Sequence, residues 1–150
     1  MNKFRIVYIS MFLLSFICFR SYGQKDNKFG IIGLSDDKIF IEFFNKFKNA
    51  VKDADSIYIS QHINYPLEVH LGKRKFIFLE QKKEFLKQYD QIFDDGLKKV
   101  ISSQTIDSVD VSEQFILLRN GQIFFNCIVG KDGNQEINVC IIYHEPLYPH

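Results

Sequence analysis

The strongest pattern in the chain is a stripe of apolar residues at helical spacing that begins shortly after Ser35. It occupies positions i, i+3, i+4, i+7 and i+11, and its members are Phe40, Phe43, Phe44, Phe47 and Val51. This spacing predicts a helix of about four to five turns with one buried aromatic face. Ser35 is suited to cap this helix, with Asp36 and Asp37 in the first turn, where the helix dipole favours acids.

Helical spacing returns in the middle of the chain. Residues 53–56 break the first pattern and can cap a short helix over residues 57–63. Two more apolar stripes consist of Phe85, Tyr89, Ile92 and Phe93, and then of Leu97, Val100 and Ile101. Asp94 and Asp95 separate these stripes and offer a cap for the second one. The sequence therefore predicts two consecutive helices here.

Alternating apolar and polar residues predict a β-hairpin between the two helical regions. Leu67, Val69 and Leu71 alternate with polar residues, and residues 76–79 form a second apolar run after a polar turn. Tyr65 is expected to be extended, because the proline after it excludes the helical conformation.

The last third of the chain has the pattern of a three-stranded meander. Strands are predicted over 111–118, 123–129 and 137–143, and an irregular tail follows. Asn120-Gly121 is a strong signal for a two-residue hairpin loop, because both residues tolerate positive φ. Residues 131–134 form a second turn. The whole order predicts an α+β fold in which helices pack on one face of a curved antiparallel sheet.

The first 23 residues are typical of a secretory signal peptide. Lys3 and Arg5 form a basic segment, 6–19 is an apolar run, and Ser21 and Gly23 suit a cleavage site before Gln24. We therefore expect an exported protein, periplasmic or secreted, with a flexible leader over 24–35 and a single domain over 36–150.

Two other interpretations of the first 23 residues, a membrane-spanning helix and a lipidated N-terminus, fit the sequence less well. The apolar run has 14 residues, whereas a membrane-spanning helix needs about 20. A lipidated Cys18 would need a small residue before it, and Ile17 stands there. We therefore expect no stable membrane anchor after cleavage.

Composition limits the partners. Cleavage would remove 23 of the 150 residues and three of the 19 Lys and Arg, which leaves 16 basic against 18 acidic residues. The mature chain has no basic excess with which to hold nucleic acid. Phosphate-binding loops, nucleophile elbows and zinc-ligand pairs are missing from the sequence, so no cofactor or metal is expected.

Cys127 and Cys140 would remain after cleavage, in a compartment where disulfides form. If Asp132-Gly133 is the hairpin loop, Cys127 faces Asn138. If Gly133-Asn134 is the loop, Cys127 faces Cys140 and a cross-strand disulfide can form. The disulfide is our expectation, with two buried free thiols as the alternative.

Several segments resemble a group of small exported bacterial proteins with the NTF2-like (cystatin-like) α+β fold. The resemblance covers roughly residues 38 to 129 and rests on Phe43, Phe47, Ala50-Val51, Asp53, residues 65–69, 84–86, Tyr89-Asp90, Ile92-Phe93 and 120–125. The last of these resembles Gly-x-Ile-Trp-Phe, with Phe124 in place of the tryptophan. The group has no well-established activity, and its fold hosts enzymes, ligand binders and interaction modules.

The resemblance implies a cone-shaped pocket between the helices and the sheet. Residues expected to line it are Tyr65, Tyr89, Asp90, Phe93 and Phe124. Tyr65, His70, Tyr89 and Asp90 are the candidates for acid–base chemistry, but none forms a pair with diagnostic spacing. We therefore expect a binding protein whose pocket or sheet holds a small apolar ligand or a protein partner. The alternatives are an isomerase- or dehydratase-like enzyme and an inhibitor or immunity-type protein. Because exposed sheets in this fold class often pair, a homodimer belongs among the expected partners.

Overall fold

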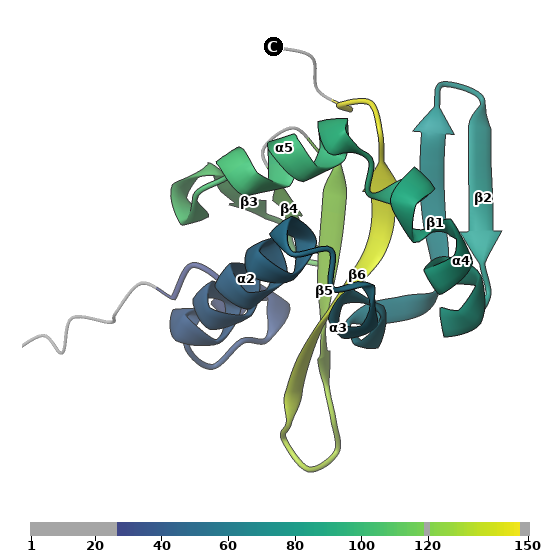
Figure 1. The fold of residues 1–150 in the computed structure, drawn as a ribbon. Coiled ribbons are helices and arrows are strands. Elements are labelled where there is room, and N and C mark those ends of the chain that lie inside the picture. Colours follow the sequence, from purple (N-terminus) through teal and green to yellow (C-terminus); the bar gives the residue numbers. More distant parts are fainter. Residues whose placement is uncertain (1–26, 119–120, 148–150) are drawn as a thin grey trace, which may run out of the picture.

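Six strands form one open sheet in the computed structural model, which describes residues 27–118 and 121–147 (Figure 1). The strands are β1 (Ile63–Gly72), β2 (Lys75–Leu79), β3 (Val109–Val111), β4 (Ile116–Leu118), β5 (Ile123–Val129) and β6 (Gln135–Tyr143). Their spatial order is β2-β1-β6-β5-β4-β3. Neighbouring strands are antiparallel, except that β1 and β6 run parallel. The expected α+β class is confirmed.

The helices lie on one face of this sheet (Figure 1). They are α2 (Asp37–Lys52), α3 (Ser56–Gln61), α4 (Lys82–Ile92) and α5 (Asp95–Ser103), with two single 3₁₀ turns, η1 (Gly30–Ile32) and η2 (Ile106–Ser108). Aspartates cap three of the helices. Asp36, Asp55 and Asp94 accept hydrogen bonds from the backbone N–H groups of Lys38, Tyr58 and Leu97. The cap of α2 is thus Asp36 and not Ser35.

The segment before α2 is packed where a flexible leader was expected over 24–35. Within its described part, Phe29 and Leu34 are buried. The carboxylate of Asp37 accepts hydrogen bonds from the backbone N–H groups of Lys28 and Phe29 at 3.1 and 2.9 Å. Two large apolar side chains and a tether to the first turn of α2 hold this segment on the fold.

The core forms around Phe125 of β5. Its ring centroid lies 5.4 to 6.4 Å from the rings of four residues on α2, which are Phe40, Phe43, Phe44 and Phe47. Phe47 and Phe125 are fully buried. The predicted stripe therefore packs on the sheet as expected, and these rings fill the space between α2 and β5.

The strand predicted over 111–118 is divided into β3 and β4. Ser112 closes a turn in the middle, because its backbone N–H donates to the carbonyl of Phe115 and its hydroxyl accepts from the N–H of Phe115. Between β4 and β5, Leu117 faces Phe124. This is the register that a two-residue Asn120-Gly121 loop gives, although Asn120 itself lies outside the described residues.

Neither expected register of the β5–β6 hairpin is right. Cys127 faces Ile137, and Val129 faces Gln135, so residues 130–134 form a five-residue loop. A bulge then shifts the register, since Phe124 faces Ile141 whereas Phe125 faces Val139. Cys140 lies at this bulge. The expected Cys127–Cys140 disulfide is not formed in this structure. Cys127 faces Ile137, and both cysteines are free.

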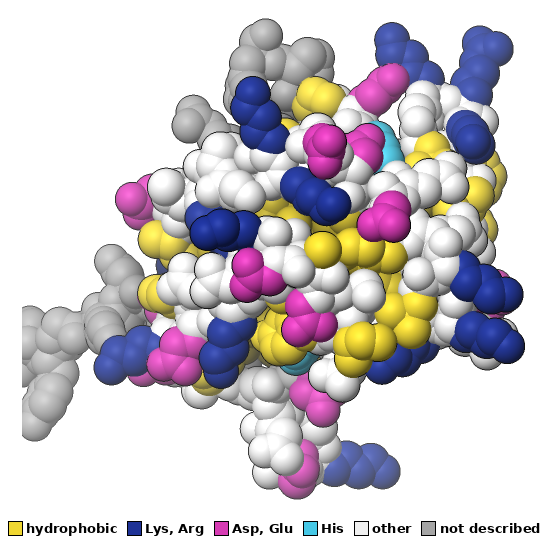
Figure 2. Space-filling model, viewed as in Figure 1, with side chains coloured by type: hydrophobic (Ala, Val, Ile, Leu, Met, Phe, Trp, Pro, Cys, Tyr) yellow, Lys and Arg dark blue, Asp and Glu magenta, His cyan; other side chains and the backbone are white. Residues whose placement is uncertain are grey.

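The helical face of the molecule carries charges of both signs and no large single-sign patch (Figure 2). Within the described part of the chain, no helix has the length and apolar character needed to cross a membrane. The predicted signal peptide, residues 1–23, lies outside the described residues.

Candidate functional site

The five residues predicted to line a pocket lie in four different environments. Tyr89 and Phe93 are buried in the core under α4, and their rings stack with centroids 5.3 Å apart. Tyr65 is half-buried on β1, and its hydroxyl donates to the carbonyl of Ser60. Asp90 is exposed at the surface of α4. Phe124 contacts Tyr143 and Phe115 and belongs to a different surface, described below.

The hydroxyl of Tyr89 is buried without a hydrogen-bond partner. Burial first, and then the nearby charges of Asp90 and Asp55, raise its pKa to about 12. The ammonium of Lys98 lies 5.9 Å from the ring centroid. The hydroxyl is therefore neutral near pH 7 and buried in this structure.

The sheet face that carries no helix holds an unbroken row of rings. From one edge strand inward, the row consists of Phe78, Phe76, His70, Tyr143, Phe124 and Phe115, and we call it the aromatic row. Successive ring centroids are 5.7, 5.9, 4.1, 5.7 and 5.7 Å apart. The row therefore crosses from β2 over β1 and β6 to β5 and the turn after β3.

Strand alternation explains why these rings share one face. In β2, Leu79 is buried in the core, so Phe76 and Phe78 point the other way. In β1, Val69 is fully buried, and His70 beside it points outward. Phe76 and Phe78 are 57% and 51% exposed, whereas soluble monomers rarely expose large contiguous apolar patches.

Glu68 pairs with His70, one of the rings of the aromatic row. The Oε1 atom of Glu68 lies 2.5 Å from Nε2 of His70, and the His70 ring stacks on Tyr143 with planes 15° apart. Burial, and then the charge of Glu68, raise the pKa of Tyr143. The pair is partly exposed, with 25% of the His70 side chain and 33% of the Glu68 side chain accessible.

Two clefts adjoin the sheet. One of about 240 Å³ lies beside the middle of the aromatic row, between the β1–β2 hairpin and the tail, and is lined by His70, Gly72, Lys73, Tyr143, Glu145, Pro146 and Leu147. Another of about 290 Å³ lies between α2, α3 and the start of β6. Phe43 and Ile137 line it, with His62, whose pKa is lowered by burial. None of the five predicted pocket residues lines either cleft.

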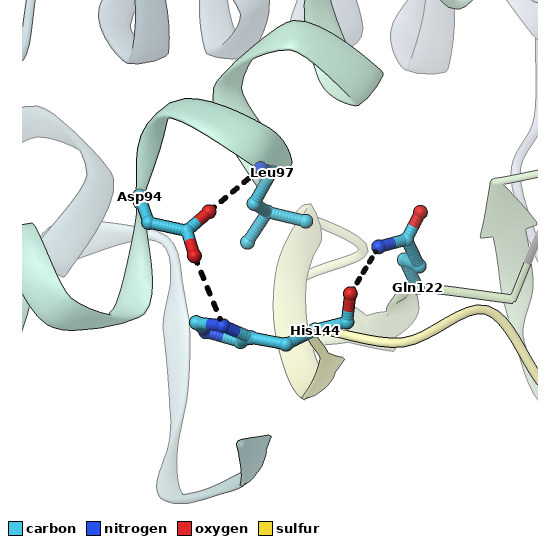
Figure 3. A network of polar contacts seen from close by, with 4 residues as sticks. All are labelled: Asp94, Leu97, Gln122 and His144. Carbon is cyan, nitrogen blue, oxygen red and sulfur yellow. Dashed lines mark hydrogen bonds and ion pairs between the residues drawn. The ribbon is translucent and has the colours of Figure 1, made fainter. Parts of the chain in front are cut away.

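A polar network joins the N-terminus of α5 to the end of β6 (Figure 3). Oδ2 of Asp94 lies 3.3 Å from Nδ1 of His144, while Oδ1 of Asp94 accepts from the N–H of Leu97. The side-chain amide of Gln122 donates to the carbonyl of His144. Nε2 of His144 is buried and has no partner. The Asp94–His144 pair thus resembles an acid–base dyad in geometry. However, Nε2 of His144, the ring nitrogen that does not face Asp94, is closed to solvent.

The sequence pattern did not indicate this network or the aromatic row. His144 was assigned to an irregular tail, and its partner is 50 residues earlier in the chain. The alternation of rings with aliphatic side chains in residues 76–79 was the one available signal for the row. Among the described residues, no group of three or more His, Cys, Asp or Glu side chains could hold a metal ion.

Comparisons with protein-family models, with curated proteins and with solved structures gave no match for this chain.

Proposed function

We propose that this chain is an exported, non-catalytic binding protein of NTF2-like architecture that pairs with a second copy of itself through the aromatic row. The strand order β2-β1-β6-β5-β4-β3, with one parallel pair and all four helices on one face, supports the architecture. Lys3, Arg5 and the apolar run after them support export.

The observation that carries the proposed function is the exposure of the aromatic row. Burial of apolar surface on association stabilises a complex by about 25 cal/mol for each Å² removed from water. Each half-exposed phenylalanine would therefore contribute roughly 1 kcal/mol to the free energy of association. Phe76 and Phe78 are the two most exposed members, and Tyr143 and Phe124 extend the surface toward the sheet centre. Aromatic residues are enriched at the centres of protein interfaces.

The environment of two acid–base groups, Tyr89 and His144, supports binding rather than catalysis. The Tyr89 hydroxyl and Nε2 of His144 are both closed to solvent, so neither meets a substrate. Phe125 and the rings of α2 occupy the position that a deep pocket would need. We propose a second copy as the occupant of the row, because a two-fold axis lets the same apolar surface of each copy face the other.

Replacing exposed rings tests this function. Phe76→Ser and Phe78→Ser should convert a dimer into a monomer while the fold remains intact, because both side chains are about half exposed. Ile57→Ser is the matched control, since Ile57 is 53% exposed on helix α3. Sedimentation equilibrium of the mature chain measures the change. A wild-type chain that stays monomeric at high micromolar concentration, or an equal loss in Ile57→Ser, would refute the proposal.

A small apolar ligand in the cleft beside α2 is the second candidate function. The observation that favours it is the apolar wall of Phe43 and Ile137 next to the neutral ring of His62. Titration with phenol, followed by the NMR signals of His62, tests this candidate. A saturable shift that Phe43→Ala abolishes would support it, and an unsaturated shift would exclude it.

A further inference from the structure

The cleft of about 240 Å³ beside the aromatic row is lined by two residues of opposite charge, Lys73 and Glu145. Lys73 belongs to the β1–β2 hairpin, and Glu145 lies in the segment after β6. Neither side chain forms a hydrogen bond or an ion pair with another residue in the described part of the chain. The cleft thus presents an ammonium and a carboxylate that are both available to a ligand.

The two charged side chains enter the cleft from neighbouring points of its wall. Oε1 of Glu145 lies 3.9 Å from the position that a Cβ atom on Gly72 would occupy, and Lys73 is the next residue along the hairpin. Because Gly72 has no side chain, the Glu145 carboxylate has room against the backbone of the hairpin. The geometry therefore places both charges at one end of the cleft without an ion pair between them.

The segment that carries Glu145 starts from a fixed point. The backbone N–H of His144 donates to the carbonyl of His70 at 2.9 Å, and the carbonyl of His144 accepts from the side-chain amide of Gln122 at 2.8 Å. Nδ1 of His144 lies 3.3 Å from Oδ2 of Asp94. Figure 3 shows the contacts with Gln122 and Asp94. A wall that is already held in place loses less conformational entropy when a ligand binds.

The ring of His70 adds a hydrogen-bond acceptor. Its Nε2 atom lies 2.5 Å from Oε1 of Glu68. An ionised carboxylate only accepts hydrogen bonds, so Nε2 of the neutral ring carries the proton and Nδ1 keeps its lone pair. No residue in the described part of the chain bonds to Nδ1, and the ring lines the cleft. The cleft thus has two groups, His70 and Glu145, that accept from an N–H donor.

The rest of the lining is largely apolar, and the cleft is small. Tyr143, Pro146 and Leu147 complete its wall, and Leu147 is 41% exposed. A volume of about 240 Å³ is below the range of roughly 300 to 1,000 Å³ that is usual for drug-sized ligands, and it suits a molecule of about ten non-hydrogen atoms. This is the size of a free amino acid.

We propose that this cleft binds a free α-amino acid with an aliphatic side chain. The ligand carboxylate meets Lys73, its ammonium meets Glu145, and its side chain packs on Pro146 and Leu147. A simple anion would be repelled by Glu145, and a simple cation by Lys73. An uncharged apolar molecule would remove water from both charges without pairing them, which costs free energy. The site is distinct from the pairing of two copies and does not depend on it.

Calorimetric titration of the mature chain with L-leucine tests the site. We expect saturable binding with a dissociation constant below about 1 mM. Two analogues each lack one charge: N-acetyl-L-leucine has no ammonium, and L-leucinamide has no carboxylate. Each should bind about fivefold more weakly or worse, because one charged group of the cleft then loses its partner.

Two substitutions assign each charge of the ligand to its residue. Glu145→Gln should weaken L-leucine and L-leucinamide by about fivefold or more without weakening N-acetyl-L-leucine. Lys73→Met should weaken L-leucine and N-acetyl-L-leucine by the same factor without weakening L-leucinamide. Both side chains are exposed, so the fold should tolerate the changes. The matched controls, Glu80→Gln and Lys75→Met, change exposed residues that do not line the cleft and should stay within about twofold of wild type.

NMR spectroscopy locates the ligand. The signals of His70 and Leu147 should shift with the calorimetric dissociation constant, whereas those of His62, which lines the cleft beside α2, should not. The inference is overturned if L-leucine gives no saturable binding up to about 10 mM, or if either analogue binds as tightly as L-leucine. It is also overturned if the control variants lose as much affinity as Lys73→Met and Glu145→Gln, or if the signals of His62 shift in place of those of His70.

The test is separate from the test of pairing. Phe78 does not line the cleft, so Phe78→Ser should bind L-leucine as wild type does, whatever its oligomeric state. A wild-type chain that is monomeric would refute the pairing and leave L-leucine binding in place. A dimer that does not bind L-leucine would refute the amino acid site alone.

Discussion

The ring of Tyr89 stacks on the ring of Phe93 with centroids 5.3 Å apart and planes 19° apart. Phe93 is fully buried and Tyr89 is 5% exposed, so the contact is part of the core under α4. The stacking holds the tyrosine hydroxyl at a position where it finds no hydrogen-bond partner. Leaving such a group unpaired costs stability, because the hydroxyl has lost its bonds to water.

Replacing Tyr89 by Phe should therefore leave the protein as stable as wild type or stabilise it by up to about 1 kcal/mol at neutral pH. Tyr65→Phe is the matched control, because the Tyr65 hydroxyl donates to the carbonyl of Ser60. Its loss should cost about 0.5 to 1.5 kcal/mol. Urea unfolding measures both changes, and a larger loss for Tyr89→Phe than for Tyr65→Phe would show that the Tyr89 hydroxyl is bonded.

The same tyrosine should make stability depend on alkaline pH. Burial raises the pKa of Tyr89 from 10.0 to about 12. The folded state therefore holds this proton more tightly than the unfolded state, and the stabilisation is complete below about pH 10 and falls as the pH rises toward about 12. Unfolding free energies between about pH 9 and 11.5 should decline less steeply for Tyr89→Phe than for wild type. If the free energies of unfolding of the two proteins declined equally with pH, the Tyr89 hydroxyl would not be buried and neutral in the folded state.

Truncating Phe47 should destabilise the core strongly. Phe47 is fully buried and meets Phe43, Phe93 and Phe125 with ring centroids 5.4 to 6.4 Å apart. We expect Phe47→Ala to lower the free energy of unfolding by about 3 to 5 kcal/mol, because a cavity remains where the ring was. Its neighbour Lys46 is exposed, and Lys46→Ala should change stability by less than about 0.5 kcal/mol. Urea unfolding compares the two variants, and a loss below about 1 kcal/mol for Phe47→Ala would mean that the rings repack.

Local spacing was sufficient to predict the helices and the first hairpin. The stripe from Phe40 to Val51 and the stripe containing Phe85 and Tyr89 both lie on buried helix faces. Such patterns are readable because each helix buries one face, whatever it packs against. The division between β3 and β4 was missed, because Ser112 turns the chain through bonds with Phe115 that apolar alternation does not encode.

The long-range features were beyond the reach of local patterns. The β5–β6 register depends on a five-residue loop and on a bulge near Cys140, and each shifts which residues face one another. The aromatic row depends on β1 lying beside β6, two strands separated by 62 residues of chain between Gly72 and Gln135. Phe124 was assigned to an interior pocket, but the structure places it, partly buried, beside Tyr143 on the sheet face that carries no helix.

Export should be visible at the N-terminus. The basic segment with Lys3 and Arg5, the short apolar run and the small residues Ser21 and Gly23 predict cleavage before Gln24. Intact-mass spectrometry of the periplasmic or secreted fraction should find a chain that begins at Gln24. A Gly23→Pro variant should slow the processing, because it changes the residue next to the cleavage site. Detection of the full-length chain, with Met1, in the cytoplasm alone would contradict export.

The two cysteines of the mature chain should titrate as free thiols. Cys127 faces Ile137, and Cys140 lies at the bulge, where its Sγ donates to the carbonyl of Phe124 at 3.3 Å. The unfolded, unreduced mature protein should therefore give two thiols per chain, and a value near zero would show that the disulfide forms.

In the folded protein, burial raises the pKa of both thiols, that of Cys140 to about 11. Since only the thiolate reacts, a pKa near 11 leaves roughly one Cys140 in a thousand reactive at about pH 8. A thiol-specific reagent should consequently modify Cys127 before Cys140, and Cys127→Ser should remove the faster phase of the reaction. Two equally fast thiols in the folded state would mean that Cys140 is not shielded by the strands around it.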